Sequence, residues 1–133
     1  MSRLWVLALP ALACACGAPT APGPTAAETA VREYVALRNA GDLPGLLGKS
    51  CGGLYSSTES LLAQSPEQRR AVTDSMRAHP VEVESVVVDP AGDHVFGATM
   101  TGSAQTAGGR RTAVQHGEVR QYRDGWRVCA LHP

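Results

Sequence analysis

The chain has 133 residues, with 12 basic and 12 acidic side chains and a formal net charge of zero. This length allows one domain with a modest core, and aromatic residues make up only 5% of it, so Val, Leu and Ala must supply most of the packing. No basic stripe or aromatic platform is present, and we therefore expect no nucleic-acid partner.

The first segment, residues 1–15, is typical of a secretory signal peptide. Arg3 provides a positive start, and the apolar run from Leu4 to Ala13 is too short to span a bilayer. The sequence therefore predicts an exported protein whose leader is removed.

The end of this leader, Leu12-Ala13-Cys14-Ala15-Cys16, resembles a bacterial lipobox, in which small residues precede a cysteine that becomes acylated. We predict that Cys16 carries the lipid, with Cys14 as an open alternative. Two or more acyl chains hold a protein stably on a membrane, so the predicted location is the cell envelope, at the outer face of the cytoplasmic membrane. Cleavage after Ala15 as an ordinary Ala-x-Ala site would instead give a secreted protein.

Residues 16–24 join this anchor to the rest of the chain. Gly17–Pro24 is rich in Pro and Gly, a composition typical of a semi-extended tether. We expect the folded domain to occupy residues 25–133.

The four cysteines of the chain can be assigned separately. Cys14 leaves with the leader and Cys16 takes the lipid, which leaves Cys51 and Cys129 as an even pair in an oxidising compartment. We predict that they form a disulfide, with two free buried thiols as the alternative. Neither has a nearby His and Asn arrangement, so a catalytic cysteine is not expected.

The first half of the domain predicts helices. Thr25 and Glu28 form a capping-box pattern that predicts a helix from Thr25 to Asn39. Asp42 with Pro44 predicts a short helix over residues 43–48, residues 54–62 predict one or two helical turns, and Ser65 with Pro66 begins a further helix that runs to Ala78.

The second half predicts strands. They cover residues 81–88, residues 94–103 and the two arms of Arg111–Pro133, with a turn at 89–93 and a flexible loop at 104–110. Arg123-Asp124-Gly125 predicts a tight turn of type I′ in the last hairpin. Helices followed by a meander of strands predict an α+β fold, with the helices packed on one face of a curved four-stranded antiparallel sheet.

Two stretches resemble a known superfamily. Ala30–Leu46, AVREYVALRNAGDLPGL, is similar to the first-helix signature of NTF2-like proteins, and RDGWRV at 123–128 resembles their closing hairpin. The positions of Cys51 and Cys129 resemble those in secreted actinobacterial lipoproteins of this superfamily. The resemblance implies a cone-shaped, cystatin-like fold. It does not imply one activity, because members include isomerases, dehydratases, hydrolases and non-catalytic binding domains.

Enzymes of this superfamily place Asp, His or Tyr at the mouth of the cone, which makes Tyr34, His116, Glu118 and Tyr122 the candidates for a ligand pocket here. The last three have even spacing and share one face of a strand. That face is either a polar pocket wall or a solvated sheet surface. The histidines lack the spacing of a metal site and no cofactor motif is present, so we predict neither metal nor cofactor.

The favoured prediction is a lipid-anchored envelope module that binds without catalysis, with either a small amphipathic ligand in the cone or another envelope protein as its partner. One alternative is a small pocket enzyme, isomerase- or hydrolase-like, which a buried carboxylate facing Tyr or His would favour. The other is a structural scaffold that forms a homodimer through its sheet, which a broad apolar outer face would favour.

Overall fold

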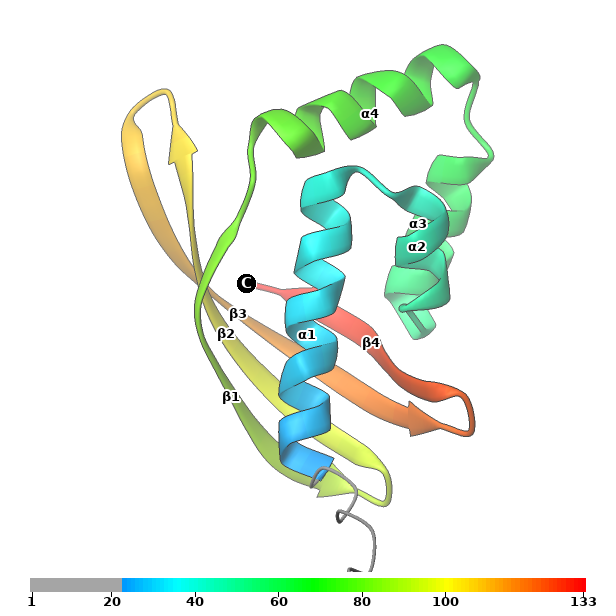
Figure 1. Ribbon diagram of the computed structural model, residues 1–133, viewed down its shortest axis with the longest axis vertical. Coiled ribbons are helices and arrows are strands. Elements are labelled where there is room, and N and C mark those ends of the chain that lie inside the picture. Colours follow the sequence, from blue (N-terminus) through cyan, green and yellow to red (C-terminus); the bar gives the residue numbers. More distant parts are fainter. Residues whose placement is uncertain (1–22) are drawn as a thin grey trace, which may run out of the picture.

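The computed structural model describes residues 23–133, in which four helices precede four strands (Figure 1). The predicted leader with Cys14, the predicted acylation site Cys16 and most of the predicted tether lie outside the described residues. The predicted α+β fold is confirmed. No helix between residues 23 and 133 is long and apolar enough to cross a membrane.

The helices are α1 (Gly23–Ala40), α2 (Leu43–Gly48), α3 (Gly52–Leu62) and α4 (Pro66–Ala78). Two predicted helix starts are confirmed. The Asp42 side chain accepts a hydrogen bond from the Gly45 backbone N–H at 2.9 Å, and Ser65 and Gln68 form the reciprocal capping box of α4. Residues 54–62 form most of an 11-residue helix rather than an isolated turn or two.

The predicted start of the first helix is wrong. α1 begins at Gly23, so Thr25 lies inside the helix and is not its N-cap. Pro24 explains the earlier start, because the fixed φ of proline suits the first turn and its missing N–H is not needed there. Glu28 forms an ion pair with Arg32 at 3.0 Å, one turn further along the helix.

The sheet is a meander in the order β1-β2-β3-β4, with all neighbours antiparallel. Its strands are β1 (Glu82–Gly92), β2 (Val95–Thr106), β3 (Gly109–Tyr122) and β4 (Gly125–His132).

Two connections between strands differ from the prediction. The flexible loop at 104–110 is instead paired strand, because Thr106 pairs with Gly109 across a two-residue turn and Gly109 adopts a φ of 103°. The turn at 89–93 is also later than predicted. β1 continues through Pro90, which an edge strand tolerates, and the chain reverses at Asp93 and His94, with a φ of 59° at His94.

The last hairpin has the predicted two-residue turn but not the predicted type. Type I′ needs a positive φ at both central residues. Arg123 and Asp124 both have negative φ, and Gly125 takes the positive angle, at 134°. The Asp-Gly pair therefore lies one position later in this turn than it would in a type I′ turn, with Asp124 as the second central residue and Gly125 directly after it.

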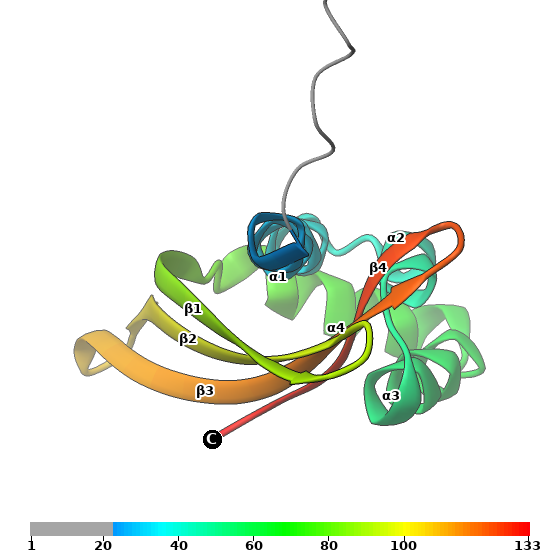
Figure 2. The ribbon, with the colours of Figure 1, turned by 90° about the horizontal axis from the view of Figure 1, so that it is seen from below.

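The core lies between α1 and one face of the sheet, with α2 and α3 beside β4 (Figure 2). From α1 come small and branched side chains, Ala27, Ala30, Val31 and Val35, and they pack on Val86, Ala98, Met100, Val119 and Val128. We call this covered side the inner face of the sheet and the opposite side the outer face.

A disulfide joins Cys51 to Cys129, as predicted, across a sequence separation of 78 residues. Two backbone hydrogen bonds lie beside it, from Cys51 N–H to the Val128 carbonyl and from Val128 N–H to the Lys49 carbonyl, both at 2.9 Å. The register of β4 shifts at this point, so that Cys129 is an extra residue opposite β3. The disulfide therefore fastens the α2–α3 junction to a bulge in β4.

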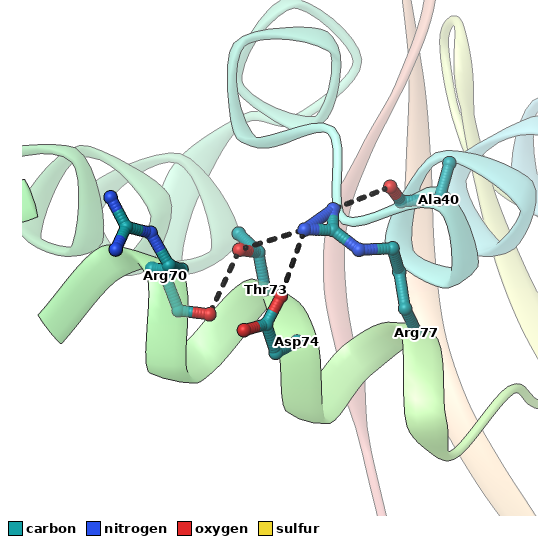
Figure 3. Close-up of polar contacts among 5 residues, drawn as sticks. All are labelled: Ala40, Arg70, Thr73, Asp74 and Arg77. Atoms are coloured by element: carbon teal, nitrogen blue, oxygen red, sulfur yellow. Dashed lines mark hydrogen bonds and ion pairs between the residues drawn. The ribbon is translucent and has the colours of Figure 1, made fainter. Parts of the chain in front are cut away.

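α4 has no buried residue, and polar contacts hold its C-terminal half against the end of α1. Figure 3 shows the Arg77 guanidinium reaching the Ala40 carbonyl, at 3.4 Å, while it also contacts Thr73 and Asp74 within α4. Arg38 donates from the other side to the carbonyls of Met76 and His79. α4 is therefore a surface helix that covers one end of the molecule.

Asn39 connects the same end of α1 to the sheet. Its amide nitrogen donates to the Val81 carbonyl at 2.8 Å, and its amide oxygen accepts from the Val81 N–H at 2.9 Å. Both backbone groups of Val81 are thus paired just before β1 begins. This bond pair fixes the separation between the last turn of α1 and the sheet.

Candidate functional site

A cavity of about 270 Å³ lies where the last turns of α1 diverge from the inner face of the sheet. Its lining comes from α1, α3, the residue before β1 and three strands, namely Tyr34, Val35, Arg38, Leu54, Val81, Met100, Gln115 and Leu131. Val35 and Met100 are buried, whereas the polar members of the lining, Tyr34, Arg38 and Gln115, are only partly buried. We call this space the cone cavity.

A second hollow of about 210 Å³ continues from the cone cavity toward the β2–β3 turn. The two share Val81, Met100 and Gln115, and the second adds Arg111 and Ala113 from β3. The two hollows thus lie side by side along the inner face, and we refer to them together as the recess.

Larger hollows occur on the other side of α1. One of about 420 Å³ is lined by Glu33, Ala36, Leu37, Ala40 and Lys49. The ion pair of Lys49 with Glu33, at 3.3 Å, lies within this lining, and both side chains are about half exposed. This hollow is an open groove along the helix surface, whereas the cone cavity reaches buried core side chains.

Two titratable side chains from α1 line the cone cavity. Burial raises the pKa of the Tyr34 phenol above its ordinary value, and the charge of Arg38 opposes this. Burial also lowers the pKa of the Arg38 guanidinium, and Tyr34 opposes that shift. Both shifts have the sign expected when a group loses contact with water.

The four predicted pocket residues do not come together. β3 pairs with β2 without interruption from Gly109 to Arg120, so its side chains alternate strictly between the two faces. Gln115 lines the cone cavity and Val119 is fully buried beneath α1. His116, Glu118 and Tyr122 therefore lie on the outer face, and only Tyr34 of the predicted set lines the cavity.

The contacts of these three residues agree with that position. His116 contacts Thr99 at 3.4 Å, Glu118 forms an ion pair with its strand neighbour Arg120 at 2.8 Å, and the Arg127 guanidinium lies over the Tyr122 ring at 5.1 Å. This row is the solvated sheet face that the spacing also allowed.

Two valines on the outer face are well exposed, Val87 to 56% and Val114 to 48%. Thr99 and Thr101 of β2 pair with them and lie between them, so the valines are separated by hydroxyl side chains. This arrangement does not favour the homodimeric scaffold.

Sequence reasoning missed Arg38, Met100 and Gln115 as parts of the cavity. A signal for Gln115 was present, because it is four residues from Val119 and thus on the same strand face. No pattern identified Arg38, whose position depends on where α1 diverges from the sheet. Within residues 23–133, no three His, Cys, Asp or Glu side chains are grouped as a metal site would require.

Comparison with known proteins adds to this picture. No family model matches the chain, and no curated protein matches it by sequence. Among solved structures, an NTF-2 like protein of unknown function from Shewanella oneidensis MR-1 superposes with a TM-score of 0.52 and 12% identity, over 78% of this chain and 92% of that one. The chain has an NTF2-like fold.

A second solved structure resembles this NTF2-like domain. It is the helical cell shape determining protein Pgp2 from Campylobacter jejuni, with a TM-score of 0.58 and 6% identity over 77% of this chain. The match spans only 38% of Pgp2. At these identities the likeness extends to the fold alone.

The environment of Tyr34 in the NTF2-like domain predicts how stability varies at alkaline pH. Because its folded pKa is raised, the unfolded chain loses the phenol proton first, at about pH 10. The stability from neutral Tyr34 should be fully present below that pH and decline as the pH rises through the folded pKa.

Urea unfolding at a series of alkaline pH values tests this expectation. Tyr34→Phe should remove that part of the decline, whereas Tyr55→Phe, which leaves Tyr34 in place, should not. If the free energy of unfolding falls equally steeply with rising alkaline pH in wild type and Tyr34→Phe, the expectation is wrong.

Proposed function

We propose that this chain is a non-catalytic binding module of the bacterial cell envelope, held at the membrane by acylated Cys16, whose cone cavity takes a small amphipathic ligand. The observation that carries the proposal is the lining of the cavity. Apolar side chains from α1, α3 and the sheet surround a few polar groups, which is the usual composition of a small-molecule site.

The same lining argues against catalysis. General acid–base chemistry needs a group whose pKa is close to the working pH. The pKa of Tyr34 is raised, which moves it further from neutral pH. Within the described residues, no carboxylate or histidine lines the cone cavity or the hollow beside it. These features support binding without turnover rather than an isomerase- or hydrolase-like activity.

Binding can be tested with neutral amphipaths on the full chain in lipid nanodiscs, with empty nanodiscs titrated in parallel to subtract partition into lipid. Straight-chain amides from hexanamide to dodecanamide should give saturable heat by calorimetry and be recovered unchanged. Ala113→Phe, which adds a ring to the recess, should weaken binding about tenfold or more. Val114→Phe is the matched control, because it adds the same ring to the outer face.

No saturable binding of any amide to the wild-type chain, or equal weakening by both variants, would argue against a ligand in the cone.

The anchor is tested separately by cell fractionation. Cys16→Ser should release most of the protein from the membrane fraction or leave it as unprocessed precursor, because it removes the predicted acylated thiol. Cys14→Ser should leave the protein on the membrane. The reverse pattern would assign the lipid to Cys14, and membrane retention of both variants without lipid mass on the N-terminal peptide would refute the anchor.

A further inference from the structure

Arg38 is a partly buried cation with no anionic partner in the described part of the chain. The six ion pairs of residues 23–133 all involve other residues. Its acceptors are neutral oxygens, those of the Asn39 side chain and of the Met76 and His79 backbone, and all are reached from one terminal nitrogen, Nη1. Nε and Nη2 make no hydrogen bond within the described residues.

Partial burial costs the Arg38 guanidinium hydration free energy, and an anionic ligand beside it would offset this cost. Burial lowers the pKa of Arg38, which means that the charged form loses hydration that the protein does not replace with a carboxylate. A guanidinium with free N–H groups matches a carboxylate, which can accept two parallel hydrogen bonds. An anion entering the cavity would therefore complete an ion pair that the fold leaves open.

The other polar groups that line the recess would also favour an anion. Gln115 and the Tyr34 hydroxyl contribute neutral donors beside Arg38, and Arg111 adds a second guanidinium toward the β2–β3 turn. No acidic side chain of the described residues lines either part of the recess. The apolar part of the cone cavity is formed by Val35, Leu54, Met100 and Leu131, so a bound molecule would meet both a guanidinium and hydrocarbon side chains.

We propose that the cone cavity selects amphipathic ligands whose polar end is a carboxylate, bound by Arg38 with help from Gln115 and Tyr34, while the hydrocarbon body lies on Met100 and its apolar neighbours. This inference rests on the proposed ligand-binding function and specifies the ligand class for the same cavity.

The test compares octanoate with octanamide, which have the same shape and differ in charge, on the full chain in nanodiscs at neutral pH, again with subtraction of empty nanodiscs. Hydrogen bonds to a charged group predict that octanoate binds about tenfold to a hundredfold more tightly. Arg38→Gln should remove this preference, so that octanoate binds no more tightly than octanamide.

Arg77→Gln is the matched control for the fold. It also removes a guanidinium that joins α1 and α4, but Arg77 does not line the cavity, so the preference should remain. If Arg38→Gln does not fold, a crystal structure of the wild-type chain with octanoate decides, because its carboxylate should lie within hydrogen-bond distance of Arg38.

Each outcome has a separate meaning. Equal affinity for octanoate and octanamide overturns the carboxylate preference and leaves the proposed ligand binding intact. If the wild-type chain binds neither octanoate nor octanamide, the proposed ligand-binding function is refuted. A preference that persists in Arg38→Gln, or a carboxylate bound away from Arg38, overturns the assignment to this residue.

Discussion

Replacing both Cys51 and Cys129 with alanine should lower the free energy of unfolding by about 2–4.5 kcal/mol. The chain-entropy model gives an upper figure of about 4.5 kcal/mol for a loop closed across this separation. The expected loss is large because the disulfide closes a long loop, and it adds to the two backbone hydrogen bonds at Lys49, Cys51 and Val128 that join the α2–α3 junction to β4.

Urea denaturation in the presence and absence of dithiothreitol measures this effect. The reductant should destabilise the wild-type protein by a similar amount and have no effect on the double variant. Non-reducing peptide mapping of protein isolated from cells should find Cys51 linked to Cys129. Free thiols at both positions, or an unchanged urea midpoint in the double variant, would refute a structural role for the disulfide.

Gly117→Ala should destabilise the fold by about 3 kcal/mol, the upper end of the usual cost of overpacking. A Cβ at this position of β3 would lie against the Ala130 carbonyl oxygen, closer than real Cβ atoms are found, and 2.9 Å from a Leu131 methyl group. The obstacle is backbone of a paired strand, so it cannot move aside as a flexible side chain would.

Gly97→Ala in the neighbouring strand is the control for this substitution. A Cβ there would meet only the Asp89 carbonyl oxygen, at an ordinary 3.8 Å, so its thermal midpoint should fall much less. Similar midpoints for the two variants would show that the close approach of β3 and β4 is not what limits position 117.

The sequence predicted the elements more successfully than their boundaries or faces. Asp42 and Ser65 are caps whose side chains determine where a helix begins, and both were found where expected. The start of α1 was misplaced because Thr25 and Pro24 offer competing signals, and tertiary contacts favour the longer helix. A Cβ at Gly23 would lie 3.2 Å from the Phe96 ring, so the first residue of the helix packs closely on the sheet.

The candidate site shows a different limit. Strand alternation correctly placed His116, Glu118 and Tyr122 on one face, but periodicity alone does not state which face a helix covers. Val119, in the opposite phase and fully buried, decides it. Arg38 was not predictable, because its contact with the cavity and with the carbonyls of α4 joins residues about 40 positions apart in the chain.

The direction of α1 has a consequence for an anchored protein. The helix begins at Gly23, near the β1–β2 turn, and its last turn lies at the opposite end, next to α4 (Figure 1). Arg38 is about 22 Å further along the helix axis than Gly23. A chain attached to the bilayer upstream of Gly23 would thus hold its recess on the far side of the domain. In such an anchored protein, the recess would be open to solutes on the side away from the bilayer. A molecule from the bilayer itself could enter the recess only if the domain turned over on its tether.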